Sequence, residues 1–154
     1  MNHGSTIFLR VVICLMGLLA LAACIIAVGN ALFNEDVGYY LPVLFLPPVT
    51  AIPFFFALYQ GLLLLHYIDK NTAFSDASVK AIKNIKYGAF AVSAIYALGM
   101  PYIIYAADKD DAPGVVLVGL VLIFAPLVVG VFAAVLEMLL KNAIEIKAEN
   151  ELTV

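Results

Sequence analysis

Residues 115–136 read VVLVGLVLIFAPLVVGVFAAVL and contain no charged side chain. An α-helix rises 1.5 Å per residue, so about 20 apolar residues are enough to cross the ~30 Å hydrocarbon core of a bilayer. Three more apolar stretches occupy residues 7–33, 40–68 and 87–107. The sequence therefore predicts an all-α integral membrane protein, a four-helix bundle with four spans.

The composition excludes an ordinary soluble domain. Hydrophobic residues make up 65% of the chain and charged residues 12%, with a mean hydropathy of +1.08, whereas about a quarter of the residues in a soluble domain are charged. Four spans use most of the 154 residues. We expect a single membrane domain over residues 1–154, with residues 141–154 as a cytoplasmic helical extension and tail.

The positive charges are segregated among the segments that join the spans. If the N-terminus is cytoplasmic, Lys109 is the one basic residue of the outer segments. The inner segments hold the other seven, which are Arg10, Lys70, Lys80, Lys83, Lys86, Lys141 and Lys147. Short loops rich in Lys and Arg remain in the cytoplasm, so we expect both termini there.

The second stretch is interrupted in its outer half by Pro42, Pro47, Pro48 and Pro53. Proline inside a helix removes a backbone hydrogen bond and clashes with the preceding turn. Thr50 is a suitable N-cap, and Pro53 would then lie in the first turn, where proline is tolerated. We expect a helix over residues 51–68, preceded by an extended or kinked segment over residues 39–48.

A short amphipathic helix is expected between the second and third spans. Ser75 is a suitable N-cap for a helix that opens with Asp76, and Lys80, Lys83 and Lys86 follow on one stripe. This helix would lie in the cytoplasmic interface. The simplest interpretation is a lysine collar that anchors a span, since an anionic-lipid site usually has roughly 4–8 basic residues.

The fourth helix is predicted to continue past the membrane, from about residue 115 to about residue 148. No Gly or Pro follows Gly130, and Leu, Glu, Lys and Ala favour helix. Glu137 is spaced for an ion pair with Lys141, or can reach a lysine of the loop helix. The extension and the loop helix should pack together as a cytoplasmic cap, through Leu136, Leu140, Ala143 and Ile144 on one side and Val79, Ile82 and Ile85 on the other.

Motifs for catalysis or cofactor binding are absent from the sequence. It has no Gly-rich phosphate loop, no HExxH and no CxxC, and the lack of ionisable residues deep in the spans disfavours an ion-coupled carrier. We predict no catalytic residue, no cofactor and no metal site. Gln60 and Tyr96 are predicted at one depth in the second and third spans, as an intramembrane polar pair.

Leu21-Ala22-Ala23-Cys24 resembles a lipoprotein cleavage site behind an apolar run. The run continues to Phe33, however, and exceeds the roughly 7–15 apolar residues of a signal peptide. We expect an uncleaved first helix with Cys24 unmodified.

Two segments resemble those of a known family. The first is Phe74-Ser75 followed by Ile82, Lys83 and Ile85, which is similar to an "FS…L+.I" loop. The second is the tail, residues 140–154, which reads LKNAIEIKAENELTV and is similar to a closing "L..A..l..ENDLTI". Together with the four spans, the whole chain resembles the YoaS-like bacterial membrane proteins, domain of unknown function 2975. Glu151 and Val154 replace the usual Asp and Ile of the tail.

The resemblance implies a small multi-pass protein of the bacterial cytoplasmic (inner) membrane with no enzymatic activity. Such proteins are frequently encoded beside a small helix-turn-helix DNA-binding regulator, which suggests a partner at the cytoplasmic face. The candidate interaction residues are Phe74, Ser75, Lys80, Lys83, Lys86, Glu149, Asn150, Glu151 and Leu152.

Three functional interpretations remain open. The first is a non-enzymatic regulatory protein that binds this regulator through its cytoplasmic face. The second is an immunity or small-molecule-binding protein with a pocket at the proline-broken outer half of the second span. The third is a stabilising subunit of a membrane complex. The expected partners are membrane lipid, the regulator and, as an alternative, a second copy of the chain, without direct contact to nucleic acid.

Overall fold

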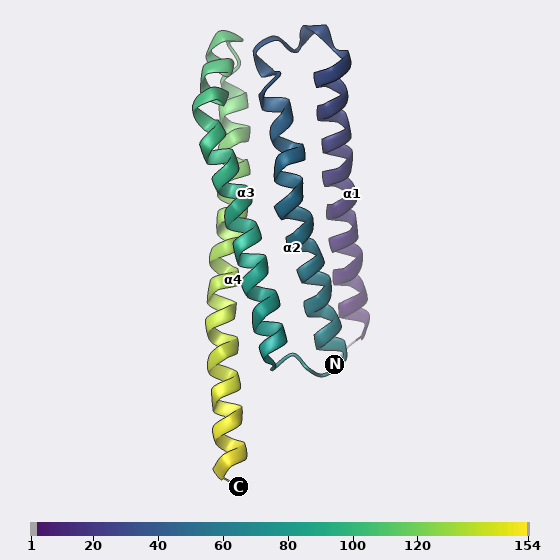
Figure 1. Ribbon diagram of the computed structural model, residues 1–154, viewed down its shortest axis with the longest axis vertical. Helices are drawn as coiled ribbons and strands as arrows, with labels where there is room; N and C mark the ends of the chain where they lie inside the picture. Colours follow the sequence, from purple (N-terminus) through teal and green to yellow (C-terminus); the bar gives the residue numbers. More distant parts are fainter. Residues whose placement is uncertain (1–2, 154) are drawn as a thin grey trace.

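The computed structural model describes residues 3–153, and α-helices account for most of them (Figure 1). The elements are α1 (His3–Phe33), the 3-10 helices η1 (Glu35–Tyr40) and η2 (Val43–Phe45), α2 (Leu46–Asp69), α3 (Asp76–Lys109) and α4 (Pro113–Thr153). Each of the four α-helices is long and apolar enough to cross a membrane. The predicted all-α class and the four apolar helices are confirmed.

The four helices are antiparallel neighbours in chain order, and α3 is the most buried of them. α1 packs on α2, α2 on α3 and α3 on α4, with the α3–α4 contact the most extensive. Within residues 3–153, α1 and α4 have at most marginal contact with each other, so the arrangement is open rather than a closed ring. The start of α1, the α2–α3 loop and the end of α4 lie at one end of the molecule, here called the terminal end (Figure 1).

The second membrane helix begins earlier than predicted. Phe45 is its N-cap, and Pro47 and Pro48 lie in the first turn of α2, where their missing N–H groups would have no intrahelical partner. Thr50 is therefore not the N-cap. Its hydroxyl donates to a carbonyl of the preceding turn, with Leu46 O at 3.0 Å and Pro47 O at 3.1 Å. The two 3-10 helices form the kinked segment before α2.

The predicted interfacial helix is in fact the first part of α3. Ser75 caps the N-terminus as predicted, since its Oγ accepts a hydrogen bond from the Ser78 N–H at 3.3 Å. The helix then runs unbroken from Asp76 to Lys109, so the prediction of a separate helix lying in the membrane plane was wrong. Ala81 and Ile82 are buried among the neighbouring helices, and this burial holds the first turns of α3 in line with the rest of the helix.

α4 confirms the predicted long fourth helix and extends past both predicted ends. Its 41 residues span ~61 Å at 1.5 Å per residue, about twice the hydrocarbon core. Its last turns continue beyond the α2–α3 loop (Figure 1). Ala133 and Glu137 are buried against the bundle, whereas Leu136, which we predicted on that face, is 54% exposed. One residue of offset turns a side chain by about 100° around the helix.

Small residues allow close helix packing and set the helix register. A Cβ added at Gly88 of α3 would lie 2.9 Å from the Cβ of Ala57 and 3.0 Å from the Pro53 carbonyl oxygen of α2. A Cβ at Gly130 of α4 would lie 2.5 Å from the Phe90 ring of α3. Such contacts are typical of membrane bundles, where close packing drives association. Gly88 is thus opposite Ala57, which fixes the relative level of every residue on α2 and α3.

Candidate functional site

One carboxylate of α4 binds two lysines in the half of the bundle nearer the terminal end. Glu137 Oε2 accepts a hydrogen bond from Lys86 Nζ of α3 at 2.7 Å, and Glu137 Oε1 lies 3.2 Å from Lys141 Nζ. The side chains of Glu137 and Lys86 are 8% and 18% exposed, and charges so far removed from water need a partner. Both partners predicted for Glu137 are confirmed. Lys86 is consequently engaged inside the bundle rather than presented on its surface.

The other lysines of the predicted collar lie on the outward face of α3. Lys80 and Lys83 are exposed, as is Tyr87. The Nζ atoms of Lys83 and Lys86 lie 5.9 Å and 5.0 Å from the centroid of the Tyr87 ring, within cation–π range. An aromatic ring beside lysines at the end of a span is typical of a membrane-interface anchor, and the collar itself stays a prediction.

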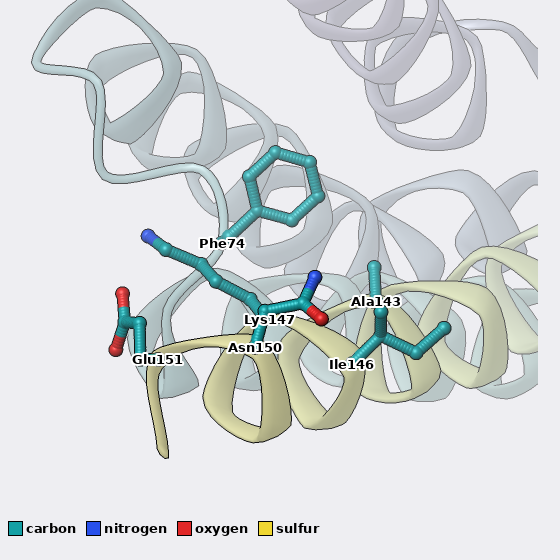
Figure 2. A pocket seen from close by; sticks show the side chains of 6 residues that line it. All are labelled: Phe74, Ala143, Ile146, Lys147, Asn150 and Glu151. Carbon is teal, nitrogen blue, oxygen red and sulfur yellow. The ribbon is translucent and has the colours of Figure 1, made fainter. Parts of the chain in front are cut away.

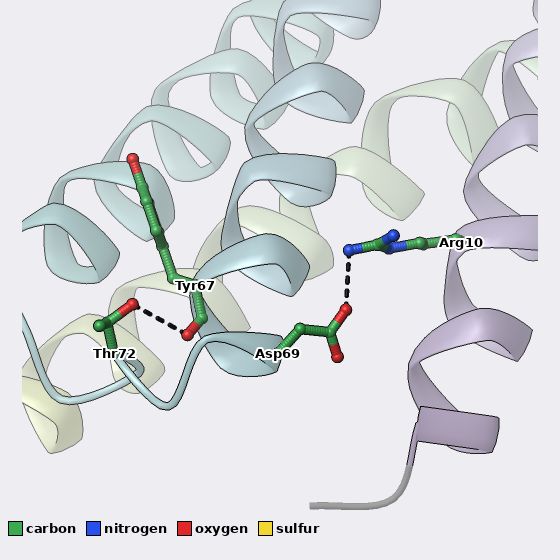
Figure 3. A network of polar contacts seen from close by, with 4 residues as sticks. All are labelled: Arg10, Tyr67, Asp69 and Thr72. Carbon is green, nitrogen blue, oxygen red and sulfur yellow. Dashed lines mark hydrogen bonds and ion pairs between the residues drawn. The ribbon is translucent and has the colours of Figure 1, made fainter.

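An ion pair between α1 and α2 was not predicted. Arg10 donates from Nη2 to Asp69 Oδ2 at 2.8 Å (Figure 3). The two residues mark the same end of consecutive antiparallel spans, and this was the sequence signal that could have paired them. The bond ties α1 to the end of α2.

The α2–α3 loop is held by its own hydrogen bonds. Thr72 Oγ1 donates to the Tyr67 carbonyl at 3.0 Å (Figure 3). Ser75 Oγ donates to the Thr72 carbonyl at 2.6 Å, and Ser78 Oγ lies 3.1 Å from the same oxygen. Ser75 therefore has a structural role, as a cap and loop brace that fixes the position of Phe74.

Phe74 and the end of α4 enclose a groove of ≈620 Å³, here called the tail groove (Figure 2). Its lining residues are Phe74, Ala143, Ile146, Lys147, Asn150 and Glu151. The α4 members follow one another at helical spacing on one face, and this spacing is the sequence signal that links Asn150 and Glu151 to Ala143. Three of the predicted interaction residues are thus brought together, since Phe74 lies beside Asn150 and Glu151 although more than 70 positions separate it from them in the chain.

The remaining interaction candidates lie outside the lining of the tail groove. Glu149 and Leu152 are exposed on α4. Ser75 belongs to the loop brace, Lys80 and Lys83 to the outward face of α3, and Lys86 to the ion pair.

The predicted hydrogen bond between Gln60 and Tyr96 is absent from the described residues. Both side chains are buried, but the Tyr96 hydroxyl pairs with Thr50 Oγ1 at 3.1 Å. Because Gly88 lies opposite Ala57, Gln60 is about one turn from that level toward the terminal end, and Tyr96 is about two turns in the other direction. The predicted depth of Tyr96 assumed that the third helix begins at residue 87. α3 begins eleven positions earlier, at Asp76, so Tyr96 lies farther from the terminal end than predicted.

At the opposite end of the molecule, η1 approaches the α3–α4 loop. Partial burial and, next, the Asp110 carboxylate raise the pKa of Tyr40 above its ordinary value. Within the described part of the chain, no group of three or more His, Cys, Asp and Glu residues is placed to hold a metal ion.

Comparison with known proteins agrees with the resemblance of the two motifs. The family described as "Protein of unknown function (DUF2975)" matches residues 29–154. The "Uncharacterized membrane protein YoaS" of Bacillus subtilis (strain 168) is 53% identical over 161 aligned positions, which cover 100% of both chains. No solved structure matches the chain.

Proposed function

The chain belongs to the DUF2975 family, whose description assigns no activity, and we propose a function from its geometry. It is a non-enzymatic multi-pass membrane protein that acts through its cytoplasmic end. There it binds a small helix-turn-helix DNA-binding regulator.

The observation that carries this proposal is the tail groove itself. Phe74 follows α2, whereas Ile146 and Glu151 belong to the end of α4, and the fold places them around one cavity (Figure 2). The hydrogen bond from Ser75 to the Thr72 carbonyl orients Phe74. The unbroken α4 helix positions Ile146 and Glu151.

The groove exposes apolar side chains where no lipid would cover them. Of its lining residues, Phe74 is 56% exposed and Ile146 59%. α4 is about twice as long as the hydrocarbon core is thick, so its last turns stand beyond the bilayer. Clustered apolar side chains in water mark a surface for a protein partner.

The charges around the groove favour an amphipathic helix as the ligand. Lys147 and Glu151 are one turn apart on α4 and place opposite charges beside the apolar floor made by Ala143 and Ile146. An amphipathic helix binds such a groove with its apolar face and pairs its charged flanks with the rim. Helix-turn-helix proteins are built from helices of this kind. Seven of the eight Lys and Arg residues lie in segments at this side of the spans, which supports a cytoplasmic position for this end. A regulator bound there would be held away from DNA.

Photo-crosslinking in native membranes tests the proposal. A photoreactive amino acid at Phe74 should capture a DNA-binding regulator, identified by mass spectrometry. The same amino acid at Leu98, which is 83% exposed on the membrane-spanning part of α3, should not.

Two variants on one helix provide the matched control. Ile146→Asp places a charge in the groove and should abolish capture at Phe74. Ala148→Asp, exposed and outside the lining, should leave capture intact. Capture of lipid alone, or capture of a regulator that persists unchanged in Ile146→Asp, would contradict the proposal.

A further inference from the structure

A second groove lies among the membrane-spanning parts of the helices, with a volume of ≈570 Å³. All four α-helices line it, including Ile13 and Ala20 of α1, Ala51 of α2, Ala89 of α3 and Ala125 of α4. The groove exists because α1 and α4 do not close the bundle and because its walls carry small side chains. We call it the membrane groove.

The polar side chains that line the membrane groove are satisfied within the protein. Cys24 Sγ donates to the Pro47 carbonyl at 3.5 Å. Thr50 bonds to a carbonyl of its own helix and to the Tyr96 hydroxyl. A buried polar group that already has its partner offers little to a ligand, so the groove suits an apolar occupant.

The dimensions of the groove suit a flexible acyl chain. Its α2 lining runs from Pro47 to Gly61, a length of ~21 Å at 1.5 Å per residue. The chains of one leaflet fill about half of the ~30 Å hydrocarbon core, so this length is sufficient for one acyl chain. Spread over this length, the ≈570 Å³ of the groove form a narrow slot that a flexible chain can fill.

The guanidinium of Arg10 lies near the end of the membrane groove that faces the terminal end of the molecule. Arg10 precedes Ile13 by three residues and so is on the same face of α1. Its guanidinium donates to Asp69 at 2.8 Å, and its side chain is 42% exposed. A guanidinium has five N–H donors in a planar fork that matches phosphate geometry. Asp69 orients this fork and leaves donors available at the headgroup level.

We propose that the membrane groove is a lipid-binding site that holds one acyl chain of an anionic phospholipid, with the phosphate of that lipid on Arg10. The apolar lining matches the acyl chain, and the exposed guanidinium of Arg10 matches the phosphate. The opening between α1 and α4 would let the chain enter from the bilayer. The site is independent of the tail groove and of the partner proposed for it.

Native mass spectrometry of the delipidated protein, titrated with phosphatidylglycerol or phosphatidylcholine of identical chains, tests the proposal. The unmutated protein should bind one phosphatidylglycerol with clear preference over phosphatidylcholine. Ala20→Phe fills the groove and should lose this lipid, whereas Ala22→Phe, exposed on the same helix outside the lining, should retain it. Ala125→Phe on the opposite wall provides a second test if Ala20→Phe does not fold.

Arg10→Gln tests the headgroup contact separately. It should still bind one phospholipid but lose the preference for phosphatidylglycerol, because Arg10 supplies the positive charge that favours a headgroup with a net negative charge over the zwitterionic phosphocholine. Equal lipid retention by Ala20→Phe and Ala22→Phe would overturn the acyl-chain site. An unchanged lipid preference in Arg10→Gln would overturn the role of Arg10, and a lipid-free dimer would show that a second copy covers the groove.

Discussion

The carboxylate of Glu137 illustrates how one residue joins two helices at the edge of the membrane-spanning region. It binds Lys86 across the α3–α4 interface and Lys141 along its own helix. The first bond is largely shielded from solvent, whereas Lys141 is 56% exposed. Loss of one member of a shielded ion pair leaves the other charge without compensation and destabilises more than loss of an exposed pair.

Glu137→Gln should therefore lower the thermal midpoint of the detergent-solubilised protein clearly more than Lys141→Gln does. Circular dichroism during heating measures both. The double variant Lys86→Met with Glu137→Leu should recover most of the loss, because it removes both charges together. Equal effects of the two single substitutions would show that Lys86 is not the partner that matters.

The Thr50–Tyr96 hydrogen bond gives a second prediction at the residue scale. Thr50→Val and Tyr96→Phe should be non-additive, with a coupling of about 0.6–1.7 kcal/mol, as found for interhelical bonds in membranes. Gln60→Leu combined with Tyr96→Phe should be additive, because those side chains lie at different levels. Unfolding in mixed micelles measures all the variants, and coupling to Gln60 instead of Thr50 would reverse the assignment.

At the scale of elements, α3 is placed by close contact on both sides. Gly88 meets α2 at Ala57 and Pro53, while Phe90 meets α4 at Gly130. A larger side chain at such a position must push two backbones apart, since the neighbouring atoms on α2 are a backbone oxygen and a Cβ that cannot rotate away.

Gly88→Leu should destabilise the protein by about 1–3 kcal/mol through overpacking. Gly29→Leu is the matched control, because a Cβ at this helical glycine of α1 meets nothing within 4 Å. Unfolding in mixed micelles provides the comparison. If both variants were equally stable, α2 and α3 would not approach as closely as the structure indicates.

At the scale of the whole molecule, an even number of antiparallel spans places both chain ends on one side of the membrane (Figure 1). The distribution of Lys and Arg predicts that this side is the cytoplasm. The same open arrangement leaves apolar side chains of α1 and α4 exposed, as expected for surfaces that face lipid.

Cysteine labelling tests this orientation in a variant whose two native cysteines are replaced. A cysteine at Asp111 should react with a membrane-impermeant thiol reagent on intact cells. A cysteine at Asn71 or Glu149 should react only after permeabilisation. All three positions are exposed, so accessibility within the protein does not confound the result, and labelling at Asn71 on intact cells would reverse the proposed topology.

Features encoded within one or two helical turns could be predicted from the sequence. Ser75 followed by Asp76 marked a helix start, and the unbroken run of helix formers after Gly130 gave the long α4. The partners of Glu137 followed from spacing and charge. Candidates for interaction could be named from the two motifs, but the sequence did not indicate that Phe74 and Glu151 would share a cavity.

The sequence by itself determined that this is a four-helix membrane protein, because hydropathy, capping and charge segregation act locally and need no knowledge of neighbours. Only the tertiary structure decided that α3 continues upright through residue 86, that Tyr96 binds Thr50, and that α1 and α4 leave a groove between them. These features depend on helix register and on the choice of neighbouring helices. Both are set by close steric contacts, such as that of Gly88 with Ala57, between residues far apart in the chain.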